Sequence, residues 1–234
     1  MALLDDILKQ YGELLSGIDQ WYARCQTAYP DEIRCRRGCS ECCRGLFDIT
    51  LTDALYLRQC FIMLSPDTQT VVVARAVKRL ESMQSLWPDF ASPYILNYRP
   101  EEKWEALMPD DDDAPCVLLG EDGRCLVYKH RPMTCRLHGL PLIDPDGTVL
   151  HDEWCTLNFA DTSPVELSAL REDFTWIFEK EVSLFRVLEK ELSNNDLKEL
   201  DTFIPLALLV DLGKFNWKDW GKRFVPADQD RAEI

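Results

Sequence analysis

Residues 35–53 read CRRGCSECCRGLFDITLTD, and this stretch is the most informative one in the 234-residue chain. It opens with a close group of four cysteines: Cys35, Cys39, Cys42 and Cys43. Thiols spaced closely in a glycine-containing loop can converge on one point at little entropic cost. A second, wider group follows: Cys116, Cys125, Cys135 and Cys155. A close group combined with a distant one is typical of a zinc or iron–sulfur site.

The adjacent pair Cys42-Cys43 limits how these thiols can be shared. Neighbouring side chains in extended backbone point to opposite faces, so the two sulfurs are not expected to bind the same single ion in the ordinary way. Either one of the pair is structural, or two metal centres flank the loop. Eight thiols suit two four-coordinate sites, or one cluster with spare thiols. The uneven gaps match no closed four-thiolate zinc finger, which favours an iron–sulfur centre over zinc.

Basic side chains surround both cysteine groups in a chain whose net charge is −15. Such an acidic chain is not expected to bind nucleic acids or anionic membranes in general. Near the first group lie one acidic and four basic residues: Arg34, Arg36, Arg37, Glu41 and Arg44. Near the second lie four basic residues: Arg124, Lys129, Arg131 and Arg136. Cationic neighbours lower the pKa of thiols and stabilise the thiolates that bind metal. This enrichment therefore favours metal binding over inert burial.

Several other side chains are expected to be structural. Cys25 and Cys60 lie on helical apolar stripes and are expected to be small buried residues. Three histidines are expected to be exposed or hydrogen-bonded: His130, His138 and His151. The best candidate among them for a further ligand is His138, which lies three residues after Cys135. The acidic run 110–113 is expected to be a solvated face rather than a cation site.

The ends of the chain indicate a cytoplasmic protein. Residues 1–15 contain acidic side chains and lack a basic start followed by an apolar block, so no secretory signal is expected. The apolar run 203–210 is interrupted by Pro205 and is far shorter than a membrane span. Because cytosolic thiols stay reduced, the cysteines are expected to serve metal binding or catalysis rather than disulfides.

Hydrophobic periodicity predicts a mainly α fold with minor β (α+β), with helices around a cysteine-rich loop and hairpin centre. We expect one domain, 1–234, in three parts: an N-terminal helix in 1–30, a metal-binding region in 31–160 and a C-terminal helical region in 161–234. Thr52 and Ser65-Pro66 are predicted to begin helices that end near residues 64 and 87. Phe47 to Leu51 alternate as a short strand does.

Turn and capping signals complete the predicted elements. Asp122-Gly123 and Asp146-Gly147 predict two hairpins. Ser163-Pro-Val-Glu166 reads as a capping box that begins a helix to about residue 192. A shorter helix is predicted over 196–213, kinked at Pro205. The aromatic first part of the tail 214–234 is expected to pack on the body.

Three ordered motifs span the middle of the chain: Cys39-x2-Cys42-Cys43-Arg-Gly-Leu-Phe-Asp-Ile-Thr-Leu-Thr-Asp, Cys116-Val-Leu-Leu, and Cys125-Leu-Val-Tyr-x2-Arg-Pro-x2-Cys-Arg. Together they resemble the YkgJ/YcgN cysteine-cluster family, a zinc- or iron-chelating domain with a Cys-x2-Cys-x2-Cys-Cys signature. The first gap is three residues here instead of two. The resemblance covers about residues 35–155 and implies these metal ligands: Cys35, Cys39, Cys42, Cys43, Cys116, Cys125 and Cys135, with Cys155 matching a further downstream cysteine.

Three functional hypotheses follow. The leading one is a metal-binding protein that holds an iron–sulfur cluster or zinc and serves redox or metal handling. The cysteine pattern is also similar to that of flagellin lysine methylases, but the scattered glycines form no G-x-G-x-x-G loop, so catalysis stays open. The third hypothesis is a structural zinc protein that acts through partner contacts of its terminal helices.

Overall fold

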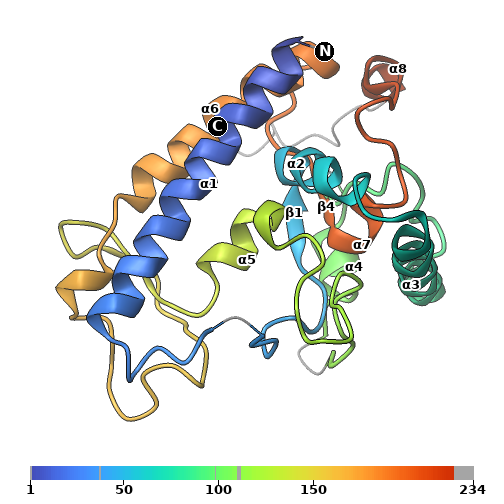
Figure 1. The fold of residues 1–234 in the computed structure, drawn as a ribbon. Coiled ribbons are helices and arrows are strands. Elements are labelled where there is room, and N and C mark those ends of the chain that lie inside the picture. The colour runs from blue at the N-terminus through green and yellow to red at the C-terminus, as the bar shows by residue number, and fades with distance from the viewer. Residues whose placement is uncertain (1, 37, 98, 110–111, 224–234) are drawn as a thin grey trace.

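The computed structural model describes residues 2–36, 38–97, 99–109 and 112–223, so Arg37 and most of the tail lie outside the described residues. The fold is mainly α with minor β, as predicted (Figure 1). The longer helices are α1 (Ala2–Ala28), α2 (Leu51–Phe61), α3 (Pro66–Leu86) and α6 (Phe174–Leu192). The shorter helices are α4 (Glu101–Glu105), α5 (Met133–Leu137), α7 (Ile204–Ala207) and α8 (Trp217–Arg223). The strands are β1 (Asp48–Thr50), β2 (Leu142–Ile143), β3 (Val149–His151) and β4 (Asp201–Phe203).

Helices α1 and α6 lie side by side along one edge of the molecule (Figure 1). The apolar stripe predicted for α1 is buried between them and the body: Ile7, Leu8, Tyr11, Leu15, Ile18 and Trp21. The Trp21 ring packs edge-on against Phe174, with centroids 4.9 Å apart. Its indole N–H also donates to the Leu170 carbonyl at 2.8 Å. Burial of this stripe is the main hydrophobic contribution that holds the two long helices together.

Two small antiparallel sheets connect the helices. β1 pairs with β4, so that Thr50 lies opposite Asp201. β2 and β3 form the hairpin predicted at Asp146-Gly147, where Gly147 adopts the positive φ of 94° that such a turn needs. The other predicted hairpin is a tight turn at 122–123 with one isolated bridge instead of paired strands.

The structure corrects the predicted starts of two helices. The cap of α2 is Thr50 instead of Thr52, because the Thr50 hydroxyl accepts the Asp53 N–H at 3.2 Å while Thr52 lies buried inside the helix. The capping box at Ser163 begins no helix. Residues 163–173 form turns and a short 3-10 segment, and α6 begins after Asp173, whose carboxylate accepts the Trp176 N–H at 2.9 Å.

The predicted helix over 196–213 is also wrong. Its middle part forms β4 because residues 201–203 pair with β1, and Pro205 stands at the start of α7 instead of kinking a longer helix. The described part of the tail packs on the body as expected: Trp217 is buried, and its indole N–H donates to the Leu212 carbonyl at 2.8 Å. Across the described residues, no helix combines the length and apolar character that crossing a membrane requires.

Candidate metal centre

The first cysteine loop is held in short turns and joined to the segment that carries Cys116. The Cys39 N–H donates to the Arg36 carbonyl at 2.8 Å, and the Cys43 N–H donates to the Ser40 carbonyl at 3.0 Å. The Cys116 N–H then donates to the Cys43 carbonyl at 2.9 Å. This last bond makes the early and late cysteine groups neighbours in space, although a long stretch of chain separates them.

A tight turn brings Cys125 back toward Cys116. The Leu119 N–H donates to the Cys116 carbonyl at 2.9 Å, and Leu119 forms a bridge with Cys125. Cys135 comes from a separate element, α5, and is half-buried. The fold thus gathers Cys43, Cys116, Cys125 and Cys135, which we name the first thiol set.

The charges of the first thiol set act on one another. Burial raises the pKa of Cys125 to about 11, and repulsion from Cys116 adds to this. Burial also raises the pKa of Cys135 well above its usual range, with further repulsion from Cys116 and Cys125. The interaction with Cys42 lowers the pKa of Cys43, against repulsion from the other three thiols of the set. Mutual repulsion of this kind is expected where thiols share a small volume, and a bound cation would relieve it.

The remaining cysteines of the cluster gather around Asn158 and Cys155. The Asn158 side chain donates to the Cys35 sulfur at 3.4 Å and to the Gly139 carbonyl at 2.7 Å. The Cys155 N–H donates to the same carbonyl at 3.3 Å. Burial raises the pKa of Cys155, and the charges of three thiols add to the shift: Cys35, Cys42 and Cys39. We name Cys35, Cys39, Cys42 and Cys155 the second thiol set.

The backbone at the adjacent cysteines is not extended, which corrects the premise of the sequence argument. Residues 41 and 42 lie in a turn instead of extended backbone, and the pKa values of the Cys42 and Cys43 thiols are shifted in opposite directions, first of all by their interaction with each other. This interaction and then burial raise the pKa of Cys42 far above its usual range. The charge of Cys42 acts both on Cys155 of the second set and on Cys135 of the first. The pair therefore stands where the two sets meet.

The donor chemistry of both sets fits zinc or iron, because both metals bind thiolates. All ten cysteines are free thiols. Among the described residues, no three Cys, His, Asp or Glu side chains stand close enough together to hold one ion as they are placed. Coordination by either set therefore requires its thiols to turn toward a common point.

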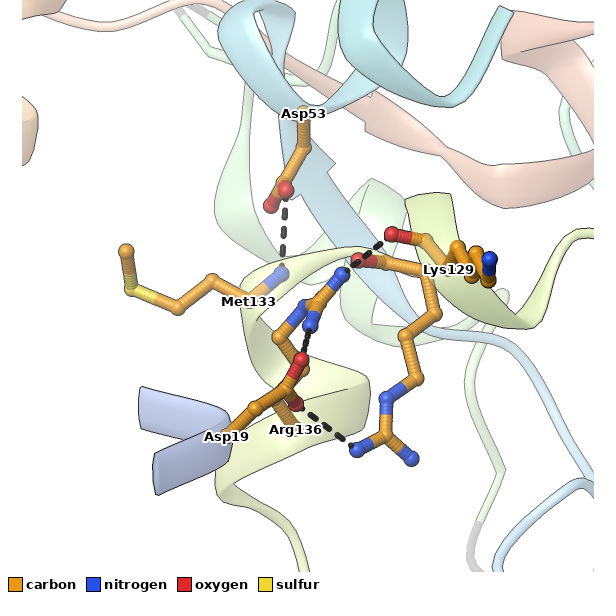
Figure 2. Close-up of polar contacts among 6 residues, drawn as sticks. Asp19, Asp53, Lys129, Met133 and Arg136 are labelled. Carbon is orange, nitrogen blue, oxygen red and sulfur yellow. Dashed lines mark hydrogen bonds and ion pairs between the residues drawn. The ribbon is translucent and has the colours of Figure 1, made fainter. Parts of the chain in front are cut away.

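Figure 2 shows how a buried arginine fastens the segment that leads to Cys135. The Arg136 side chain is only 3% exposed and donates to the Lys129 carbonyl at 2.8 Å and to the Arg131 carbonyl at 3.1 Å. It also forms an ion pair with Asp19 of α1. These contacts tie the turn at 128–131 to both α5 and α1, so they set the position of Cys135.

A buried carboxylate fixes the other side of α5. Asp53 of α2 accepts the Met133 N–H at 2.9 Å and the Tyr11 hydroxyl at 2.8 Å (Figure 2 shows the contact with Met133). Sequence analysis identified neither Asp53 nor Tyr11 as part of the site. Asp53 lies within the motif at 39–53, but a lone aspartate in a helix gives no signal of a contact with a distant segment.

The basic residues near the thiols differ in part from those predicted. Burial raises the pKa of Cys125, and the positive charge of Arg131 opposes that shift, as expected. Burial likewise raises the pKa of Cys116, and here the opposing charge is Arg79 of α3, which was not predicted. Arg44 instead donates to the Asp113 carbonyl at 3.1 Å.

One member of the acidic run is not a solvated residue. Asp112 is partly buried, pairs with Arg79 and accepts the Ala114 N–H at 3.0 Å. The hydrogen bond with Arg79 is the main reason why the pKa of Asp112 lies below its usual range. Asp113 is exposed, as expected, while residues 110–111 lie outside the described residues.

The remaining candidates have structural surroundings. Cys25 is buried, and its thiol donates to the Ala169 carbonyl at 3.6 Å, which confirms the prediction of a small core residue. Cys60 is half-buried. His130 stacks on Tyr56 with ring centroids 4.7 Å apart, yet its buried Nδ1 has no hydrogen-bond partner in the described part of the chain. His138 packs edge-on against a phenylalanine ring, and burial and then His151 lower its pKa.

Comparison with known protein families gives a match over the middle of the chain. Residues 34–156 match the model of the CxxCxxCC family, whose description reads "putative zinc- or iron-chelating domain". The matched region contains both thiol sets. Searches of curated proteins and of solved structures find no significant match.

Proposed function

Because the chain belongs to the CxxCxxCC family of zinc- or iron-chelating domains, we propose that it binds metal through two sets of cysteine thiolates. The first site uses the first thiol set: Cys43, Cys116, Cys125 and Cys135. The second site uses the second thiol set: Cys35, Cys39, Cys42 and Cys155. The observation that carries the proposal is the hydrogen bond between Cys116 and Cys43, since it joins two cysteine groups that are distant in sequence.

The division between the sites falls between the two adjacent cysteines. Cys43 is bonded through its backbone to the segment of the first set, whereas Cys155 and Asn158 surround the second set. Four thiolates for each site match the usual number for both a tetrahedral zinc ion and an iron–sulfur cluster.

An iron–sulfur centre is the identity that we favour, since the uneven cysteine gaps differ from those of closed four-thiolate zinc fingers. A bound iron–sulfur cluster would supply one-electron transfer, whereas bound zinc would supply a structural cross-link. The thiols would bind the metal, and the positive charges of Arg131 and Arg79 would offset part of the negative charge of such a site. The proposed role is therefore redox chemistry or metal handling in the cytoplasm.

Metal analysis and visible spectra of protein purified without oxygen test this proposal. The wild type is expected to carry iron and to absorb visible light. Cys135→Ser is expected to remove only the metal of the first site, and Cys155→Ser only that of the second, while the control Cys25→Ala keeps both. A wild type without bound metal would contradict metal binding. A colourless protein with stoichiometric zinc would contradict the iron–sulfur identity, and loss of all metal from either variant would contradict two separate sites.

A further inference from the structure

A cavity of about 570 Å³ lies beside the thiol sets and belongs to neither of them. Its walls come from elements that are far apart in sequence: β1, α2, α5, α6 and β4. Figure 1 shows α5 between α1 and the strands β1 and β4. The volume falls within the range of about 300–1,000 Å³ that is typical of small-molecule sites, and it far exceeds that of a bare ion.

The cavity is strongly acidic. Five carboxylates line it: Asp48, Asp53, Glu153, Glu181 and Asp201. Its described lining includes two histidines but neither lysine nor arginine. Arg136 acts on Asp53 from outside the lining and is itself paired with Asp19. The negative charge that faces the cavity is therefore not neutralised from within it.

One carboxylate in this cavity belongs to a buried residue and uses only one of its two oxygens in hydrogen bonds within the described part of the chain. The Asp53 side chain is only 2% exposed, and its Oδ1 accepts both of its hydrogen bonds. In the described part of the chain, Oδ2 has no hydrogen-bond partner, and Figure 2 shows it without a contact to the residues drawn. Glu181 likewise uses one oxygen, which accepts from the Thr50 and Tyr11 hydroxyls, and Asp201 uses one, which accepts from Asn97. Three carboxylates from separate elements thus each keep an oxygen for a further donor.

Apolar and aromatic side chains cover the rest of the wall, including Ile49, Leu137, Trp154 and Phe178. Such surfaces suit the carbon skeleton of a ligand, and aromatic rings attract organic cations. Burial also raises the pKa of Glu181 to about 7 and that of Asp201 to about 6. A cation in the cavity would favour their ionised forms.

We propose that this cavity binds a small organic cation, with its charged nitrogen at the carboxylates of Asp53, Glu181 and Asp201 and its carbon skeleton against Trp154 and Phe178. This inference does not rest on the proposed metal sites. It assigns the molecule a second ligand, of the class of alkylamines and guanidines, next to the α5 segment that carries Cys135.

Calorimetric titration of the full chain with putrescine and with agmatine tests the proposal, at about pH 8, where the carboxylates are ionised. At least one cation is expected to bind saturably, while the matching uncharged diol does not bind. Glu181→Gln and Asp201→Asn are each expected to weaken binding about tenfold or more, because each removes a charge-assisted contact. The matched control is Glu179→Gln, an exposed glutamate of α6 outside the cavity, which should leave binding unchanged.

A second measurement avoids dependence on the folding of the variants. In the wild type, the bound cation should shift the NMR signal of the Trp154 indole and leave that of the exposed Trp176 unchanged. The proposal is overturned if neither cation binds saturably below about 10 mM, if Glu179→Gln weakens binding as much as Glu181→Gln, or if binding leaves the Trp154 signal unmoved.

Discussion

Replacement of Arg136 by methionine tests how the segment before Cys135 is held. Methionine supplies an unbranched side chain similar to the aliphatic stem of arginine, but it cannot make the hydrogen bonds to the Lys129 and Arg131 carbonyls. Hydrogen bonds to a charged group contribute about 1.5–3 kcal/mol each, and the packed methionine recovers some of the loss. We therefore expect Arg136→Met to lower the free energy of unfolding by about 3–4 kcal/mol, or the melting temperature by about 10 °C.

The ion pair with Asp19 should contribute much less than these bonds. The Asp19 side chain is 46% exposed, so solvent screens the pair and Asp19→Asn should cost at most about 1 kcal/mol. Urea unfolding followed by circular dichroism measures both variants against the wild type at equal metal content. The reasoning is refuted if Asp19→Asn is as costly as Arg136→Met, because the ion pair would then hold the segment instead of the carbonyl contacts.

Three further predictions concern the second thiol set, the acidic cavity and the packing of α1. Gly139→Ala and Gly147→Ala both place a side chain at a positive φ, where it is strained. Only the Gly139 carbonyl accepts hydrogen bonds from Asn158 and Cys155, so only Gly139→Ala should reduce the bound metal measured by elemental analysis. Burial and then Asp53 raise the pKa of Glu181 from 4.5 to about 7, so this group's contribution to stability falls as the pH rises through that window. Glu181→Gln should therefore be more stable than the wild type by up to about 3 kcal/mol at high pH and equally stable below the window, and parallel urea titrations that show the same difference at every pH would contradict this. Trp21→Phe should cost about 1–3 kcal/mol in the same assay, since it leaves a buried carbonyl without its donor.

Local signals predicted the parts of the fold that depend on neighbouring residues. The apolar period of α1, the Ser65-Pro66 start of α3 and the Asp146-Gly147 turn each depend on a few adjacent positions, and the structure confirms all three. The pairing of β1 with β4 joins residues near 50 to residues near 200, so no local pattern could reveal it. The same pairing explains why the predicted helix over 196–213 does not form.

The residues of the candidate site, like the elements of the fold, could be predicted only where the signal in the sequence is local. The sequence identified the thiols, because cysteine is rare and its spacing is informative. It could not identify Asn158 or Asp53, because each acts through a contact with a distant segment: Asn158 with Cys35, and Asp53 with the start of α5. The backbone conformation at Cys42-Cys43 was predicted wrongly, since extended backbone was assumed where the chain makes a turn.

Anomalous X-ray scattering from crystals of protein purified without oxygen would test the two-site account most directly. Data collected at the metal absorption edge locate each metal centre independently of the protein atoms. The account predicts two separate peaks, one surrounded by Cys43, Cys116, Cys125 and Cys135, the other by Cys35, Cys39, Cys42 and Cys155. A single peak bound by both members of the adjacent pair would contradict it, and so would sulfur–sulfur bonds between the two sets.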